Sequence, residues 1–232
     1  NNEIFTRYVR DEKNRNSISA NIIYAICEDA SGFLWVGTAN GLNKFDRKTE
    51  KFTRYFHDPS NNKSLSSSII SSLVYDSKIN SLWIGTKNGG LNRLDLSNNK
   101  IVSYKNDPAD PNSISDNFVN CLYHDKADNL WIGTFGGGLN QFIEKENRFI
   151  VYKKNDVLQS IPTDFVISIE EDNSGNLLLG TYEDGLVVLN IKTNETITYK
   201  HDSDDPESIG DNLIHDIYKD KSGLIWLGTW TN

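Results

Sequence analysis

The chain has 232 residues, and its 24 basic and 32 acidic residues give it a net charge of −8. This balance disfavours a nucleic acid backbone or an anionic lipid surface, so we expect neither nucleic acid nor direct membrane contact as a partner. No apolar run approaches the roughly 20 residues that a membrane-spanning helix needs. The two cysteines, Cys27 and Cys121, are expected to be small buried thiols and indicate no cellular compartment.

A short motif, Leu-Trp-Ile-Gly-Thr with small variations, recurs along the whole chain with a period of 47 to 48 residues. Its five copies are Leu34–Thr38, Leu82–Thr86, Leu130–Thr134, Leu177–Thr181 and Ile225–Thr229. A fixed period of roughly 20–50 residues is typical of repeat proteins, in which each repeat is one supersecondary unit that packs against its neighbours.

Each full repeat is predicted to form four strands, because short apolar runs alternate with Gly, Asn and Asp turns. In chain order we expect an isolated outer strand at 1–8, complete blades at 17–55, 64–104, 113–152 and 160–199, and the first two strands of a fifth blade at 208–232. This pattern predicts an all-β fold, a β-propeller of four-stranded antiparallel blades. A parallel β-helix would need shorter coils, and a leucine-rich repeat would need a period near about 25.

The first strand of every blade ends in an aspartate. These residues are Asp29, Asp76, Asp125, Asp172 and Asp220. Three of them open Asp-x-Ser-Gly turns, in which the carboxylate accepts backbone hydrogen bonds and Gly adopts a positive φ. We therefore interpret them as turn residues, with calcium ligation as the alternative.

The tryptophan of the repeated motif is expected to lie between adjacent blades, where the nearby Gly allows the next sheet to approach closely. We therefore interpret the tryptophans as core residues. The fourth blade has Leu178 at this position, which predicts a thinner contact with its neighbour.

The segment Leu82 to Asp95, with its pattern L-W-I-G-T-x-x-G-G-L-N-R-x-D, resembles the two-component regulator propeller repeat, and the resemblance extends over essentially the whole chain. It implies the periplasmic sensor region of a hybrid two-component system histidine kinase, with oligosaccharides or polysaccharides as the usual signals. It further implies a second propeller, another β-domain, a membrane helix and a kinase outside this segment.

The two ends of the chain fall inside repeats, which predicts open blade edges. We expect a part of a larger ring whose edges are paired, through self-association at the open edges or dimerisation of the full receptor. The alternatives are that the two ends combine into one incomplete blade, or that several chains join edge to edge.

The familiar catalytic and cofactor motifs are absent from the sequence, including G-x-S-x-G, H-E-x-x-H, C-x-x-C and the phosphate-binding loop. Each of the four histidines precedes an Asp, but Asp recurs at most of these positions without His, so it belongs to the repeat. We therefore expect no catalytic residues, no metal and no cofactor in this segment.

Ligand binding is expected where the repeats differ, which is at the tips between the second and third strands and in the connections between blades. The candidate tip residues are Phe135, Tyr182, Trp230, Lys87, Asn88, Glu183 and Asp184. A weaker prediction places Tyr24, Asn120 and His215 of the first strands in the central channel. The three aromatic tips suit stacking on a sugar ring, and the alternative is that they pack against the neighbouring blade. The polar connections could hydrogen-bond sugar hydroxyls or simply be solvated turns.

Two classes of function follow. The favoured one is a noncatalytic extracytoplasmic sensor module that binds a glycan or a partner domain, or only scaffolds other subunits. The alternative is a propeller enzyme, a lyase or glycosidase, for which Glu183 and Asp184 are the adjacent acidic candidates. Carboxyl groups on one hairpin are poorly placed for glycoside hydrolysis, which needs them roughly 5–10 Å apart across a cleft.

Overall fold

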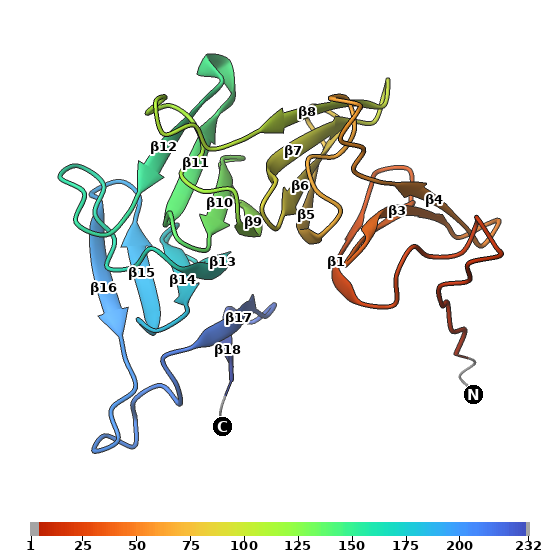
Figure 1. Cartoon of the computed structure of the whole chain (residues 1–232). Helices are drawn as coiled ribbons and strands as arrows, with labels where there is room; N and C mark the ends of the chain where they lie inside the picture. The colour runs from red at the N-terminus through yellow and green to blue at the C-terminus, as the bar shows by residue number, and fades with distance from the viewer. Residues whose placement is uncertain (1–4, 231–232) are drawn as a thin grey trace. The chain divides into compact units, whose positions relative to one another are not determined.

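The computed structural model describes residues 5–230, which form antiparallel sheets joined by turns (Figure 1). The first blade comprises β1 (Ile23–Glu28), β2 (Leu34–Thr38), β3 (Gly41–Asp46) and β4 (Lys51–Tyr55). The second comprises β5 (Ile70–Asp76), β6 (Ser81–Thr86), β7 (Gly90–Asp95) and β8 (Lys100–Tyr104). The third comprises β9 (Val119–His124), β10 (Leu130–Thr134), β11 (Leu139–Ile143) and β12 (Arg148–Tyr152), with a short 3-10 turn at Glu144–Glu146. The fourth comprises β13 (Val166–Glu171), β14 (Leu177–Thr181), β15 (Leu186–Asn190) and β16 (Glu195–Tyr199).

Each of these four blades is a four-stranded sheet whose strands lie in sequence order. The last two strands, β17 (Ile214–Lys219) and β18 (Ile225–Thr229), pair with each other as an incomplete fifth blade. The predicted β-propeller fold of four-stranded antiparallel blades, with an incomplete last blade, is therefore confirmed.

The chain divides into two compact units. The first contains residues up to 87 together with 91–103, and the second contains 88–90 together with the residues from 104 onward. In the first unit β1 contacts β5, and in the second β13 contacts both β9 and β17, so first strands pack side by side.

The predicted core position of the tryptophans is confirmed where a following blade covers them. Trp35 packs in one cluster with Ile70 and Ile84 of the next blade, and Trp131 packs with Val166 and Leu179. In the fourth blade, the corresponding cluster is built on a leucine and is smaller. Its buried members are Leu178, Leu186, Ile214 and Ile217.

The aspartates at the ends of the first strands act as turn residues, as predicted. One carboxylate oxygen of Asp125 accepts hydrogen bonds from the amides of Ala127 and Asn129, at 2.9 and 2.8 Å. The other oxygen accepts a 2.8 Å hydrogen bond from the indole N–H of Trp131. Asp29 binds Trp35 in the same way. The aspartate thus joins the turn to the residue that fills the blade interface.

A buried asparagine of the third strand holds the connection that leads into each of the first three blades. In the first blade, the side-chain oxygen of Asn43 accepts a 2.9 Å hydrogen bond from the Ser19 amide, and its NH₂ group donates to the Ser19 hydroxyl at 2.8 Å. Asn92 and Asn140 make the same pair of bonds, whereas the fourth blade has Val187 at this position.

Two expectations differ from the structure. The predicted outer strand at 1–8 lies partly outside the described residues, and residues 5–8 are not in a strand, because they pair with no strand of the described chain. Tyr8 nevertheless packs edge-on against Phe45 and Phe52, as Tyr104 does on the third blade. Cys27 and Cys121 were expected to be buried thiols. They are free thiols that pack beside the interblade clusters and are only half-buried.

Candidate functional site

The hairpin tips are held beside the beginnings of the first strands by a repeated backbone hydrogen bond. In each full blade, the first residue after the Gly-Thr pair donates its amide to a carbonyl just before or at the start of the first strand. The bonds run from Ala39 to Ile22, from Lys87 to Ile69, from Phe135 to Phe118 and from Tyr182 to Phe165, at 3.0 to 3.3 Å. Each tip therefore forms one surface with the entry to its blade.

Four aromatic residues of the third and fourth blades come together on this surface, and we name them the aromatic patch: Phe118, Phe135, Phe165 and Tyr182. The ring of Phe135 lies 5.3 Å from that of Phe118 and 5.0 Å from that of Phe165. It also meets Tyr182 edge-on at 5.4 Å. The structure thus brings together two of the predicted tip residues, Phe135 and Tyr182, across two neighbouring blades.

The members of the aromatic patch differ in exposure. Phe135 is half-buried among the other three rings. Its contacts with Phe165 and Tyr182 are the packing against the neighbouring blade that was the alternative to sugar stacking. Tyr182 is 40% exposed and Phe165 is also exposed. Part of each of these two rings is therefore open to solvent.

Trp230 and His215 form a second aromatic pair on the fifth blade. Their rings are stacked, with centroids 5.8 Å apart and planes inclined by 24°. Trp230 is 71% exposed, so this predicted tip residue lies largely in solvent.

The polar tip candidates divide between the two units. The Lys87 ammonium lies 4.7 Å above the ring of Tyr24, a cation–π contact within the first unit. Asn88 is exposed and adopts a left-handed turn with φ of 69°. Asp184 forms a 3.1 Å ion pair with Lys200, and Glu183 is exposed beside it.

The weakly predicted channel residues share a structural feature that the sequence did not reveal. In every blade the first strand carries a register shift at its second residue. Tyr24, Asn120 and His215 occupy this position, and a bulge of this kind redirects a side chain away from the regular pleat. The Asn120 amide donates a 3.0 Å hydrogen bond to the Ile167 carbonyl, which is the bulge residue of the next blade.

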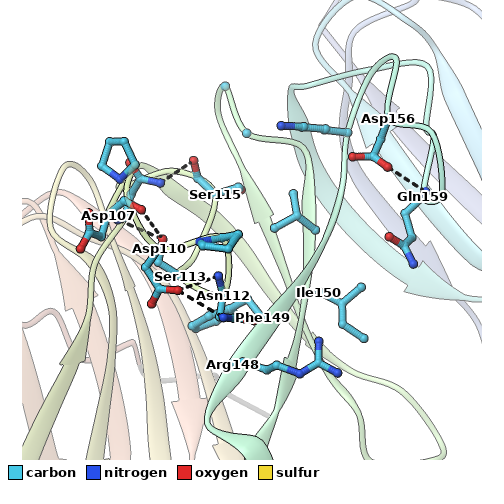
Figure 2. Close-up of a pocket in the computed structure, with 17 residues that line it drawn as sticks. Asp107, Asp110, Asn112, Ser113, Ser115, Arg148, Phe149, Ile150, Asp156 and Gln159 are labelled. Atoms are coloured by element: carbon cyan, nitrogen blue, oxygen red, sulfur yellow. Dashed lines mark hydrogen bonds between the residues drawn. The ribbon is translucent and has the colours of Figure 1, made fainter.

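A cavity of about 670 Å³ lies in the second unit (Figure 2). Its walls are two connections, 106–115 and 153–159, together with β12 and the glycines Gly136 and Gly137 that follow Phe135. A volume of this size is within the range of small-molecule sites, roughly 300–1,000 Å³.

The cavity wall carries carboxylates that each use one oxygen to hold their own loop. Asp107 accepts from the Ala109 amide, and Asp156 accepts from the amides of Leu158 and Gln159, at 2.8 to 3.1 Å. These bonds hold both carboxylates in the cavity wall. Arg148 of β12 also lines the cavity and forms a 2.5 Å ion pair with Glu146.

The sequence pointed to the polar connections between blades, which include Asp156, but it did not single out Arg148 or Gln159. One signal could have drawn attention to this connection, Lys153 to Ser160. It is closed by a different hydrogen bond from the other connections between blades. Elsewhere a serine hydroxyl closes the connection by accepting from an aspartate amide six residues earlier, as Ser113 does with Asp107. In this connection the Lys153 amide instead donates to the Gln159 carbonyl.

Within residues 5–230, no group of three or more His, Cys, Asp or Glu side chains is arranged to hold a metal ion. His57 and His201 bond through their Nδ1 atoms to the carbonyls of Leu65 and Ile209, at 2.6 and 2.8 Å, and so secure their own connections.

The four-stranded blades and the tryptophans buried between them define a β-propeller that is built from sequence repeats. Three segments, 17–40, 113–136 and 208–231, match the model of the two-component regulator propeller. These three segments are therefore two-component regulator propeller repeats, which agrees with the resemblance seen in the sequence.

The solved structures similar to this chain include two extracellular domains from B. thetaiotaomicron. One belongs to a hybrid two-component system and has 27% identity and a TM-score of 0.83, covering 96% of this chain and 30% of that one. The other belongs to a one-component system and has 28% identity and a TM-score of 0.74, covering 96% and 28%. This chain thus spans less than a third of the length of these structures.

A lyase is also among the similar structures. Virginiamycin B lyase from Staphylococcus aureus has 15% identity and a TM-score of 0.66, covering 90% of this chain and 64% of that one, and this likeness concerns the fold alone. No curated protein matches the chain. None of the described residues forms a helix with the length and apolarity of a membrane span.

Proposed function

We propose that this chain is a periplasmic sensor module of a two-component signalling receptor, and that it binds a neutral oligosaccharide. The single observation that carries the ligand assignment is the aromatic patch. Tyr182 is exposed at a hairpin tip, where turn geometry requires no large apolar side chain, and Phe165 is exposed beside it, directly before β13.

An aromatic face is suited to a sugar because the C–H groups of a pyranose ring form an apolar surface that packs on it. The cavity adds hydrogen-bond donors and acceptors, which a sugar's hydroxyl groups require. Its walls present the carboxylates of Asp107 and Asp156 as acceptors and the Gln159 side chain as both donor and acceptor. The cavity and the aromatic patch are neighbours along the chain, because Gly136 of the cavity wall directly follows Phe135 of the patch.

The role of the full receptor is part of the same proposal. The extracellular domain of a hybrid two-component system, similar over 96% of this chain, supports a sensor that passes ligand binding to a cytoplasmic histidine kinase. In that arrangement this segment is noncatalytic, and its rigid blades transmit the binding event.

The experiment is isothermal titration calorimetry of the chain against a panel of neutral oligosaccharides. We expect a saturable heat for at least one of them. Tyr182→Ala should weaken that binding about tenfold, which corresponds to about 1.4 kcal/mol, because the ligand loses one stacking face. Tyr199→Ala is the matched control, since Tyr199 is an exposed tyrosine on the outer strand β16 and its loss should leave the affinity unchanged.

A panel that gives no heat with the folded chain would contradict the ligand assignment and favour a scaffold that holds other subunits. Equal losses of affinity for Tyr182→Ala and Tyr199→Ala would place the binding surface elsewhere. Thermal unfolding of both variants shows whether the fold itself has changed.

A further inference from the structure

One residue shortly before the first strand of each blade joins two loops, and we name it the junction residue. Its side-chain oxygen accepts a hydrogen bond from an amide near the start of the connection that leads into this blade. The bonds run from Arg10 to Asn21, from His57 to Ser68, from Asn106 to Asn117, from Lys154 to Asp164 and from His201 to Asn212, at 2.8 to 3.3 Å. Each connection is therefore fixed near its beginning by the blade that it enters.

The backbone carbonyl of the junction residue binds the hairpin tip of the blade that the connection has left. In each case a glycine at or just before the start of the third strand donates its amide. These bonds run from Gly41 to Ser68, from Gly90 to Asn117, from Gly138 to Asp164 and from Gly185 to Asn212, at 2.6 to 2.9 Å. The junction residue thus holds a connection and a hairpin tip together.

Asp164 differs from the other junction residues. It carries a carboxylate, whereas the others are Asn or Ser. Its carbonyl also accepts a second tip amide, that of Gly136, at 2.9 Å. Gly136 belongs to the cavity wall, and Phe165, the next residue in the chain, belongs to the aromatic patch. Asp164 is therefore bonded to the cavity wall and covalently linked to the patch.

The connection that Asp164 holds, residues 153–160, has few other attachments. In the other connections a serine hydroxyl accepts the amide of an aspartate and donates to the carbonyl of the same aspartate. The pairs are Ser17 with Asp11, Ser64 with Asp58, Ser113 with Asp107 and Ser208 with Asp202, at 2.8 to 3.1 Å. Within residues 5–230, the bond from Lys154 to Asp164 is the one hydrogen bond that ties residues 154–160 to a residue outside their own connection.

Side-chain packing adds little to this attachment, because Val157 and Leu158, the two apolar residues of the connection, are both exposed. Asp156 and Gln159, which flank them, line the cavity. These are two of the polar groups assigned to the sugar in the proposed function. Their position relative to the aromatic patch therefore depends mainly on the bond between Lys154 and Asp164.

We infer that Asp164 is a positioning residue of the proposed site. It fixes the cavity wall 153–160 relative to the aromatic patch, so that Asp156, Gln159 and the aromatic rings contact one sugar ligand together. Asp164 is not among the residues that line the cavity, so it acts through the wall that it holds. The inference rests on the proposed function for the identity of the ligand, whereas the attachment of the wall can be measured without one.

Hydrogen exchange followed by mass spectrometry tests the attachment. Asp164→Ala removes the acceptor, so the amides of residues 154–160 should exchange about tenfold faster than in the unmodified chain. Asp164→Asn keeps an acceptor oxygen, as Asn117 and Asn212 do at the equivalent positions, and should restore the slower exchange. Asn212→Ala is the matched control, because it breaks the same bond in a connection outside the cavity, and it should leave residues 154–160 unchanged.

Calorimetry with a neutral oligosaccharide that binds the unmodified chain gives the second readout. Asp164→Ala should weaken binding about fivefold, because the wall no longer holds its polar groups in place. Asp164→Asn and Asn212→Ala should bind with the affinity of the unmodified chain. Every variant keeps the backbone carbonyl that accepts the tip amides, so the fold should persist, which thermal unfolding verifies.

Unchanged exchange in Asp164→Ala would overturn the inference, as would an Asp164→Asn variant that exchanges as fast as Asp164→Ala, or faster exchange of residues 154–160 in Asn212→Ala. A sugar that binds Asp164→Ala with full affinity would also overturn it, while leaving the proposed function intact. If no neutral oligosaccharide binds the unmodified chain, the proposed function fails, and the exchange measurements then decide the role of Asp164.

Discussion

At the scale of single residues, one aspartate per blade connects turn geometry to core packing. The carboxylate of Asp125 accepts two turn amides and the indole N–H of Trp131, and it is buried with that indole. Asp220 makes the equivalent bonds to Trp226 at an exposed position. The same residue pair therefore occurs in two environments that differ mainly in burial.

Asp125→Ala should lower the free energy of unfolding by at least about 2 kcal/mol, because it leaves a buried indole N–H and two turn amides without their acceptor. Asp220→Ala is the matched control and should cost clearly less, since water can replace the carboxylate there. Urea unfolding of the two variants measures the difference. Equal losses would show that the turn, rather than the buried indole, sets the cost.

Asp220 also leads to a prediction on pH. Hydrogen bonds donated by the Ser222 hydroxyl, and then by the Trp226 indole, lower the pKa of Asp220 to about 2. Since the unfolded value is about 3.9, the stability that this carboxylate contributes is present above about pH 4 and is lost as the pH falls through 2. An NMR titration should give Ser222→Ala a higher Asp220 pKa, while an unchanged pKa would contradict the role of the hydroxyl.

The turn role of these aspartates could be predicted from the sequence, because a D-x-S-G turn is a local structure. Their bond to the tryptophan could not, since the two residues are six apart and meet only when the hairpin forms. The same limit applies to Phe135. Its position at a tip was evident, but its burial depends on Phe165 and Tyr182 of the next blade.

At the scale of elements, the first strands combine a tight interblade contact with a bulge. The glycine of the second strand permits the tight contact, and the bulge at the second residue of the first strand turns one variable side chain out of the pleat. The positions of the strands could be predicted from the sequence, because apolar runs and turn residues are local signals. The bulges did not, because they are a property of pairing between two strands.

Gly133→Ala should destabilise the chain by about 1–3 kcal/mol, because the new methyl group would come within 2.8 Å of Val166 on the next blade and would also meet Cys121. Gly228→Ala is the matched control, since its methyl group would meet only atoms of its own blade at ordinary contact distances. Thermal unfolding of both variants tests this. Comparable shifts in Tm would mean that strand propensity, and not the interblade contact, is responsible.

At the scale of the whole molecule, the net charge of −8 bears on the choice of ligand. If the chain binds an oligosaccharide, its negative field should disfavour uronic or sulfated sugars relative to neutral ones. We expect the affinity for an acidic oligosaccharide to rise with added salt and that for a neutral one to stay constant. Calorimetry at two ionic strengths tests this, and tighter binding of the acidic sugar at low salt would contradict it.

The connection between the third and fourth blades has a practical consequence. Val157 and Leu158 at its tip are 95% and 75% exposed, and among the connections in residues 5–230 it is the one that lacks the serine closure. An exposed loop tip is where a chain is most readily cut or extended. A protease site or a fluorescent label placed between these two residues would report on occupancy of the adjoining cavity without altering a single strand.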